Sequence, residues 1–312
     1  MMRSLYSAIS GLKNHQIRMD VVGDNIANVN TSGFKRSRVS FGTMLSQTTK
    51  GASSPTTSPE RGGTNAIQIG LGATIGSVDK ITTQGSAQYT GQDTDMMLQG
   101  SGYFVLLNGS TQVYTRAGGF IFDKSGNLED PATGALVQGY IADATGVITA
   151  SGGTSKITVN LKDAPKYLPT VTPAPTPANY VANNFQLESY SIDQSGVITG
   201  VYTYVGAADA TVPKSITAKI AQIAVATFSN DAGLVNAGNN FLMETNNSGT
   251  PSIGAPGTGG RALVIPNNLE MSNVDLSQEM TDMIVTQRGF QANSRVITVS
   301  DTLLEELINL KR

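Results

Sequence analysis

The sequence of 312 residues contains no cysteine and no tryptophan, and it has a single histidine, His15. Without cysteine the chain forms no disulfide bond and no cysteine-ligated metal site. Charged residues make up 14% of the chain, whereas globular domains carry roughly 25%. A surface with so few charges, rich instead in Gly, Ser, Thr, Asn and Gln, is suited to packing against other protein.

Long apolar runs and an excess of one charge are also missing. No stretch approaches the roughly 18 apolar residues of a membrane-spanning helix, and the first turns are interrupted by Ser7, Ser10, Gly11 and Lys13. The sequence therefore predicts neither a membrane insertion nor a cleaved signal peptide. The formal net charge of -2 argues against nucleic acid or an anionic membrane surface as a partner.

Convergent catalytic groups are absent as well. His15 stands on a predicted helix and is expected to be a surface residue rather than part of a catalytic triad. The Gly100-Ser101-Gly102 segment lacks the spacing of a phosphate-binding loop. We therefore predict no catalytic residue, no cofactor, no metal site and no enzymatic activity.

What the chain does have is a long heptad pattern from Asn273 to Arg312. Asp275 and Gln278 form a plausible capping box at its start. Steps of four and three residues lead through a mostly apolar seam, interrupted by Gln287, Ser294 and Asp301. This periodicity predicts a coiled-coil helix, with the apolar seam residues Leu276, Met280, Met283, Phe290, Ile297, Leu304 and Ile308.

A shorter version of the same pattern occupies the first 28 residues, with Gln16 and Gly23 as interruptions. A helix with one apolar stripe needs a partner, so we expect the two ends of the chain to pair. The alternative is two unrelated amphipathic helices on a globular core. Polar seam residues favour a helix pair packed among copies of itself, with the N-terminal interface residues Leu5, Ile9, Leu12, Met19 and Ile26.

Between the two ends, short apolar runs are punctuated by turn dipeptides such as Asn108-Gly109, Ser125-Gly126 and Ser195-Gly196, which is typical of antiparallel hairpins. Five of the twelve prolines fall between Pro165 and Pro177. The predicted fold class is α+β, mainly β. Its predicted domains are a helical coiled coil (1–30 and 272–312), a core β-domain (31–145 and 185–271) with a long connecting loop (46–64), and a small Pro-rich insertion or reduced outer domain (146–184).

A small basic cluster, Lys35, Arg36 and Arg38, follows the first helix. Such a cluster either meets an acidic neighbour or forms a solvated loop exit, and the second interpretation is the simpler one.

Three groups of motifs resemble the axial proteins of the bacterial flagellum, the rod and hook proteins. The first is Met2 to Leu12 followed by Asp24 to Lys35. The second comprises the segments Gly100 to Val105 and Tyr114 to Phe120, and the third is Leu269 to Leu276 with Met283 to Arg288. Within the family, Ser191 to Gly200 and the ending Leu307 to Arg312 are most similar to hook proteins. The small insertion departs from the larger hook proteins, which carry a full outer domain.

The resemblance implies a structural subunit of the flagellar hook, polymerising into a hollow curved tube that transmits torque between rod and filament and serves as an export channel. Expected partners are copies of the chain itself, the flagellar rod, the hook cap, the hook–filament junction proteins and the flagellar type III export apparatus. The expected location is extracellular. A distal rod protein is the alternative, and a secreted carbohydrate-active enzyme with a carboxylate pair is a remote one.

Phe41 and Leu45, in Phe41-Gly42-Thr43-Met44-Leu45, also resemble the Phe-x-x-x-apolar pattern attributed to recognition of rod and hook subunits by the export gate. In the alternative interpretation both side chains simply pack within the fold.

Overall fold

The computed structural model describes residues 2–57, 60–143, 146–150, 153–159, 185–204 and 215–310. The chain divides into two compact units. Unit 1 comprises residues 1–29, 36–81 and 274–312, and unit 2 comprises residues 30–35 and 82–273. The predicted fold class is confirmed, because the two terminal helices are in contact with each other and an antiparallel β-rich region lies between them in the sequence.

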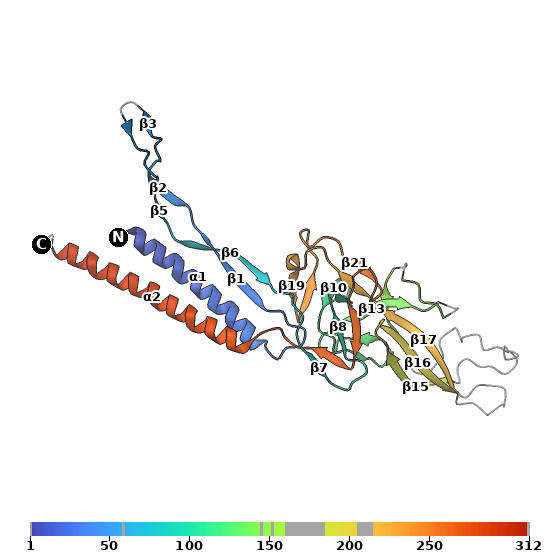
Figure 1. Cartoon of the computed structure of the whole chain (residues 1–312). Coiled ribbons are helices and arrows are strands. Elements are labelled where there is room, and N and C mark those ends of the chain that lie inside the picture. The colour runs from blue at the N-terminus through green and yellow to red at the C-terminus, as the bar shows by residue number, and fades with distance from the viewer. Residues whose placement is uncertain are drawn as a thin grey trace. The chain divides into compact units, whose positions relative to one another are not determined.

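Unit 1 contains the helices α1 (Met2–Ala27) and α2 (Leu276–Asn309), which lie side by side (Figure 1). The Asp275 carboxylate accepts hydrogen bonds from the backbone N–H groups of Ser277, at 2.9 Å, and Gln278, at 3.3 Å. This N-cap satisfies two of the donors that the first turn of a helix leaves unpaired. The predicted start of the C-terminal helix is therefore confirmed.

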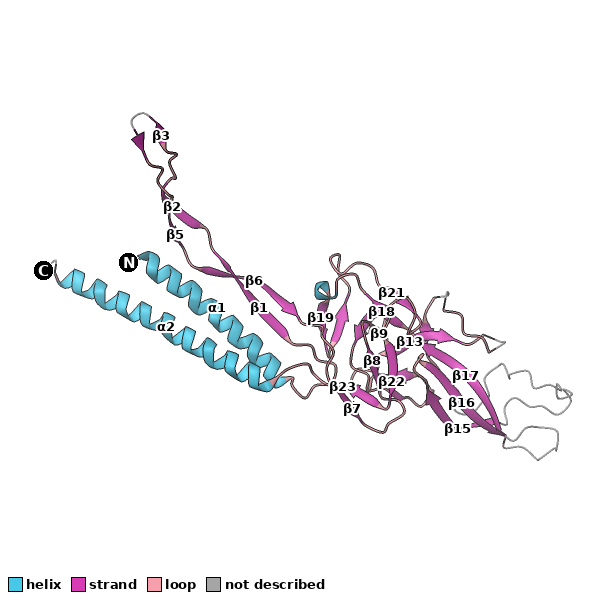
Figure 2. Cartoon of the chain, in the orientation of Figure 1, coloured by secondary structure: helices cyan, strands magenta, loops and turns pink. Residues whose placement is uncertain are grey.

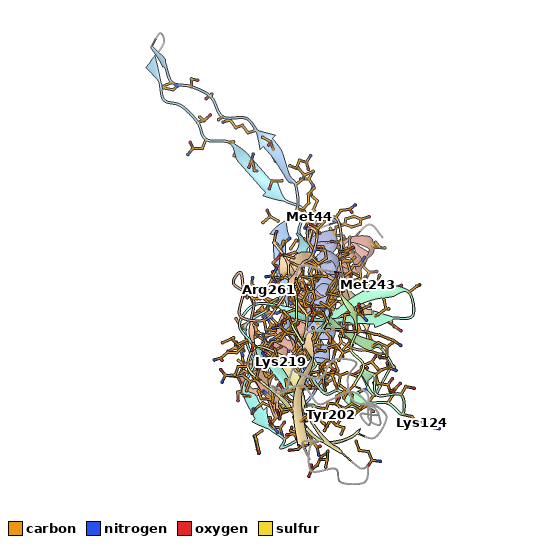
Figure 3. All side chains as sticks on the ribbon, turned by 90° about the vertical axis from the view of Figure 1, so that its right-hand side faces the viewer. Met44, Lys124, Tyr202, Lys219, Met243 and Arg261 are labelled. Carbon is orange, nitrogen blue, oxygen red and sulfur yellow. The ribbon has the colours of Figure 1, made fainter. Side chains whose placement is uncertain are left out.

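Unit 1 also contains a long two-stranded arm. Strands β1 (Ser37–Thr43) and β6 (Ala73–Lys80) pair next to α1, and the arm continues through β2 (Ser46–Lys50) with β5 (Ile67–Gly70) and β3 (Thr56–Thr57) with β4 (Glu60–Arg61). Every residue of β2 and β5 is exposed. Figure 3 shows this outer part of the arm beyond Met44 as a thin ribbon with its side chains in the open.

Residues 46–64, expected to be a loop, thus carry paired strands instead. The strands within this range, β2, β3 and β4, contain no large apolar residue, so the apolar alternation that signals a half-buried strand is missing. Cross-strand pairs of hydroxyl groups hold the arm together, as between Ser53 Oγ and Thr64 Oγ1 at 2.8 Å. Thr residues also favour extended backbone because they are branched at Cβ.

Unit 2 is built around one antiparallel sheet in the order β15-β16-β17-β13-β9-β10-β20-β19. These strands are β9 (Tyr103–Asn108), β10 (Thr111–Thr115), β13 (Leu136–Ile141), β15 (Phe185–Ile192), β16 (Val197–Tyr204), β17 (Ser215–Ile223), β19 (Val235–Gly238) and β20 (Phe241–Met243). Figure 2 shows strands β15, β16 and β17 of the sheet side by side. Attached to it are β11 (Ile121–Phe122), β12 (Leu128–Glu129), β14 (Ser155–Lys156), β18 (Val225–Thr227) and β21 (Ser252–Gly254). Two separate pairs complete the unit, β8 (Met96–Gln99) with β22 (Leu263–Pro266) and β7 (Ala87–Tyr89) with β23 (Asn268–Glu270), together with the short 3-10 helix η2 (Asp231–Gly233).

One turn recurs three times in unit 2, starting at Asp123, Asp143 and Asp193. In each case the carboxylate accepts a hydrogen bond from the backbone N–H four residues later, at 2.7, 3.0 and 2.9 Å. The glycine three residues after the aspartate has a positive φ of 79°, 74° and 70° respectively, a conformation that suits glycine. The predicted turns at Gly126 and Gly196 are therefore confirmed.

The hydrophobic core of unit 2 contains aromatic and aliphatic side chains from most of these strands, including Phe104, Phe120 and Tyr202. Ile157 and Val159 are fully buried in the same core, although they lie within the predicted insertion 146–184. Residues 160–184, which contain the proline-rich stretch, lie outside the described residues. The division into three domains stays a prediction.

Candidate assembly interface

The helices α1 and α2 pair in antiparallel orientation with a defined register. A Cβ added at Gly11 would lie 2.6 Å from Nδ2 of Asn293, and one at Gly289 would lie 2.7 Å from Cε1 of His15. Further along, Arg18 Nη2 lies 3.1 Å from Asp282 Oδ1. Glycine on one helix opposite a larger side chain on the other lets the two backbones approach closely.

The fully buried positions of α2 are polar. The buried residues of α2 are Glu279, Thr286 and Ser300, at intervals of seven residues or multiples of seven. The hydroxyl groups of Thr286 and Ser300 donate to the backbone carbonyls of Asp282 and Val296, at 2.6 and 2.8 Å. Back-bonding of this kind satisfies a buried hydroxyl within its own helix.

The seam predicted from the sequence is only partly covered within the single chain. Four of its residues on α2 are exposed, and its interruptions Gln16, Gln287, Ser294 and Asp301 are exposed as well. The exposed residues are Leu276, Met280, Phe290 and Ile308, whereas Met283, Ile297 and Leu304 are half-buried. On α1, Ile9 is exposed and Leu5, Leu12, Met19 and Ile26 are half-buried. Their role between subunits stays a prediction.

A second set of apolar side chains on α2 was not predicted. It lies outside the seam and is exposed as well, so α2 presents far more apolar surface than α1 covers. Its residues are Ile284, Val285, Val296, Val299, Leu303 and Leu307, and the exposed Leu310 follows directly after the helix. Contiguous exposed apolar surface on a long helix marks a protein-binding face.

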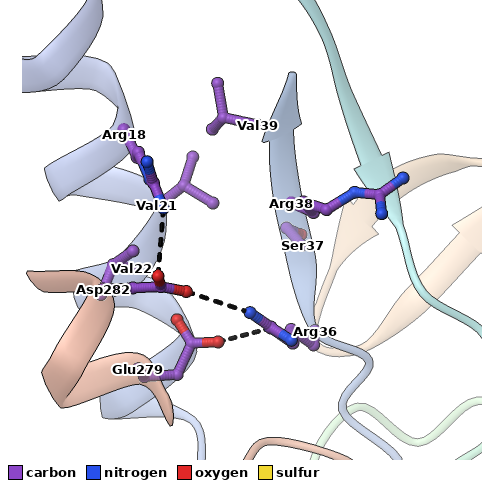
Figure 4. A pocket seen from close by; sticks show the side chains of 9 residues that line it. All are labelled: Arg18, Val21, Val22, Arg36, Ser37, Arg38, Val39, Glu279 and Asp282. Atoms are coloured by element: carbon purple, nitrogen blue, oxygen red, sulfur yellow. Dashed lines mark hydrogen bonds and ion pairs between the residues drawn. The ribbon is translucent and has the colours of Figure 1, made fainter. Parts of the chain in front are cut away.

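A charged network joins α1, α2 and the start of the arm around a small cavity (Figure 4). Arg36 contacts two carboxylates of α2, Glu279 through Nε at 2.5 Å and Asp282 through Nη2 at 3.4 Å. Glu279 is buried and also accepts a hydrogen bond from Asn25 Nδ2 at 3.1 Å. Asn25 in turn exchanges two hydrogen bonds with the backbone of Ser37, both 2.9 Å. The network fixes the antiparallel register at this end of the helix pair.

His15, expected at the surface, is half-buried. Its ring packs against α2 at Gly289, and its Nδ1 atom is buried without a hydrogen-bond partner. The Phe41 ring lies edge-on to it, with centroids 6.2 Å apart. Burial, and secondarily the positive charge of Arg18, lower the pKa of His15 from 6.5.

The two residues of the predicted export-gate pattern lie in different surroundings. Phe41, on β1, contacts His15 and has the Arg18 guanidinium 6.0 Å above its ring. Leu45, between β1 and β2, is 86% exposed. Phe41 is itself 42% exposed despite these contacts, so neither side chain is buried in the single chain and the export-gate pattern stays a prediction.

Unit 2 contains a buried ionic cluster that the sequence did not reveal. The fully buried carboxylate of Glu270 lies 2.6 Å from Lys35 Nζ and 3.4 Å from Arg116 Nη1, and it accepts the backbone N–H of Gly85 at 3.0 Å. Burial lowers the pKa of Lys35, while the hydrogen bond and charge of Glu270 act in the opposite direction. Lys35 is thus buried, although the simpler interpretation of the basic cluster placed it in a solvated loop.

The two cations of this cluster also form hydrogen bonds with neighbouring backbone. Lys35 Nζ donates to the carbonyl of Thr83 at 2.8 Å, and Arg116 Nη2 donates to the carbonyl of Gly100 at 2.9 Å. The chain leaves unit 2 directly after Lys35 and a few residues after Glu270. The ion pair between Glu270 and Lys35 therefore joins the two segments at which the chain leaves this unit.

Among the residues that the structure describes, no group of three His, Cys, Asp or Glu residues is arranged to hold a metal ion. Among the same residues, neither helix is long and apolar enough to cross a membrane.

Three family descriptions match separate parts of the sequence. They are "Flagella basal body rod protein" over residues 5–35, "Flagellar hook protein FlgE/F/G D1 domain" over residues 97–200, and "Flagellar basal body rod FlgEFG protein C-terminal" over residues 265–310. The first and last of these regions include most of α1 and all of α2, where the exposed apolar surface lies.

Individual rod and hook proteins are similar to this chain along its whole length. The flagellar basal-body rod protein FlgG of Bacillus subtilis is 44% identical over 313 aligned positions that cover all of both chains. The flagellar hook protein FlgE of Borreliella burgdorferi is 33% identical over 453 positions, and that of Treponema pallidum 31% over 476, again covering all of both chains.

These similarities define a structural protein of the bacterial flagellum, not an enzyme. The chain belongs to the family of flagellar rod and hook proteins, which form the axial structure of the basal body and hook.

Proposed function

We propose that this chain is the subunit of the distal rod, the straight shaft of the flagellar basal body. The observation that carries the proposal is length. The alignment with the rod protein needs 313 positions for the 312 residues of this chain. The alignments with the two hook proteins need 453 and 476 positions, so those proteins have about 453 - 312 = 141 and 476 - 312 = 164 positions without a counterpart here.

This proposal replaces the hook subunit favoured by the sequence motifs. Segments such as Ser191 to Gly200 are similar to hook proteins, but the family description that matches residues 97–200 covers FlgE, FlgF and FlgG alike, so a short motif within it discriminates poorly. A missing segment of more than a hundred residues changes what the outer surface of a subunit presents. It therefore carries more weight than the motif.

The proposed mechanism is self-assembly through the terminal helices. The buried polar positions of α2 are used within the subunit, and its exposed apolar surface remains for neighbouring copies. A contact between two different faces generates a helical filament when the rotation between copies does not close into a ring. The further partners we propose are the neighbouring rod and hook components and the type III export apparatus.

The proposal is tested by complementation in Bacillus subtilis. We expect the chain to restore motility to a strain that lacks its own rod protein FlgG and not to a strain that lacks its hook protein. Basal bodies purified from the rescued strain should show a straight rod by electron microscopy. Rescue of the hook-deficient strain alone, with curved particles, would favour the hook subunit instead.

The export route is a separate proposal with its own prediction. Leu45 is nearly free of contacts in the folded subunit, so a role in recognition by the export gate explains its exposure better than packing does. Replacing Leu45 by alanine is expected to lower secretion several-fold and to leave the stability of the purified chain unchanged. Secretion is measured by immunoblotting of culture supernatants.

Two variants complete that experiment. Met44→Ala, at the neighbouring exposed position, is the control and should be secreted normally. Phe41→Ala should lower secretion and also reduce stability, because Phe41 packs on His15 and Arg18. Normal secretion of the Leu45→Ala chain would contradict recognition by the export gate and favour the interpretation in which both side chains simply pack within the fold.

A further inference from the structure

His15 occupies an unusual position in the helix pair. Its imidazole lies where a side chain at position 289 would stand, 2.7 Å from the Cβ that Gly289 lacks. The Phe41 ring closes a second side at 6.2 Å between centroids. The Nδ1 atom is buried and has no hydrogen-bond partner. The contact therefore accommodates a neutral ring and offers no acceptor for a second N–H.

The charges around this contact oppose protonation. On α1, Arg18 lies one turn further along and covers the same Phe41 ring, with Cζ 6.0 Å from the ring centroid. On α2, Asp282 is engaged by Arg18 and Arg36 at 3.1 and 3.4 Å. Arg288, next to Gly289, donates to Gln291 Oε1 at 3.3 Å.

Neither strand packed on α1 contributes a charge to the pKa shift of His15, which comes from burial and Arg18. On β1, the residue that meets His15 is the aromatic Phe41. On β6, Asp79 accepts a hydrogen bond from Ser77 Oγ at 2.9 Å. The negative charge of Asp24 acts on Lys80, where it opposes the lowering of the Lys80 pKa by burial. An imidazolium formed at His15 would therefore be a second cation beside Arg18, partly removed from water.

We propose that the contact between His15 and Gly289 makes the pairing of the two terminal helices sensitive to mild acid. When the ring is neutral it packs against α2. When it takes up a proton, the cation draws away from Gly289 toward water and the antiparallel pair loosens at its middle. The inference does not depend on whether the subunit belongs to the rod or the hook, since it concerns a contact within one chain.

The sign of the effect follows from proton linkage. Burial and Arg18 hold the pKa of His15 below 6.5 in the folded chain, so the unfolded chain takes up the proton first. The stability contributed by the neutral ring is complete above pH 6.5 and is lost as the pH falls from there through the folded pKa. Each unit of difference between the two pKa values lowers the folding equilibrium constant about tenfold.

The experiment uses the fact that His15 is the only histidine of the chain. In a carbon–proton NMR titration of the soluble full-length protein, the imidazole signals therefore belong to one residue. We expect a pKa below 6.5, which moves toward 6.5 in Arg18→Gln. A pKa at or above 6.5 in the unmodified chain would overturn the proposal.

A second measurement tests the consequence for the helices. Urea unfolding is followed by circular dichroism at pH 7.5 and pH 5.5 for the unmodified chain and for His15→Gln, which does not titrate. The midpoint of the unmodified chain should fall more between the two pH values than that of the variant. Equal falls in both proteins would contradict a role for His15, and the NMR titration stands even if the variant folds poorly.

Discussion

Replacing Glu270 by alanine is expected to destabilise unit 2 by about 3–5 kcal/mol, because it leaves two buried cations without their shared anion. Lys35 and Arg116 reach Glu270 at 2.6 and 3.4 Å and are themselves almost completely buried. The backbone N–H of Gly85 loses its acceptor in the same change. A loss of this size is a large part of the total stability of most domains.

The measurement is urea unfolding of the full chain, followed by the near-ultraviolet circular dichroism of tyrosine. Tyr103, Tyr114 and Tyr202 are buried in unit 2, and the chain has no tryptophan to mask their signal. Glu244→Ala removes an exposed carboxylate from the same unit and should change the stability by less than about 0.5 kcal/mol.

A double-mutant cycle separates the ionic contribution from other effects. Lys35→Met combined with Glu270→Gln removes one cation together with the anion, so the double variant should be more stable than the sum of the two single losses predicts. Strict additivity would show that Lys35 and Glu270 do not depend on each other. The cluster would then be a set of independent hydrogen bonds to backbone.

The second large effect is expected at the exposed apolar surface of α2. Replacing both Val299 and Leu303 by aspartate should abolish polymerisation of the purified chain while its monomer remains folded. Both side chains are about half exposed in the single chain, so the monomer loses little. In an assembled interface, each buried carboxylate would lack a partner, and a cost of about 3 kcal/mol per added subunit raises the critical concentration more than 100-fold.

The matched control adds the same charge to the same turns of the helix. Thr298 and Thr302 are exposed and polar, and Thr298→Asp with Thr302→Asp should still polymerise if the apolar residues are the ones that meet a neighbour. Sedimentation and electron microscopy measure both variants. Filaments of the Val299 and Leu303 variant, or loss of filaments in both pairs, would contradict the assignment of this face.

The helices show what could be predicted from residue patterns and what could not. Their extents follow from local signals, namely the heptad spacing, the Asp275 cap and the accumulation of Asn and Gly after Ala27. The face on which the two helices pair could not be predicted from these local signals. Apolar residues line more than one side of α2, and the side that meets α1 carries Glu279, Thr286 and Ser300, which an apolar periodicity cannot detect.

The ionic clusters escaped prediction for a different reason. Lys35 and Glu270 are separated by 235 positions, and Arg18 and Asp282 by 264, so no local spacing connects them. The only available signal was the basic cluster after the first helix, and its simpler interpretation was a solvated loop. Burial of Lys35 beside Glu270 emerges only when distant strands meet.

The sequence by itself determined the elements with a local cause: two terminal helices, hairpin turns at glycines of positive φ, and membership of the flagellar rod and hook family through its motifs. These depend on capping, backbone freedom and short-range spacing, which are properties of neighbouring residues. The tertiary structure alone decided which face of α2 pairs with α1, that His15 packs on Gly289, and that Glu270 holds Lys35 and Arg116. Those contacts join segments far apart in the chain, and their energies depend on burial, which no local pattern records.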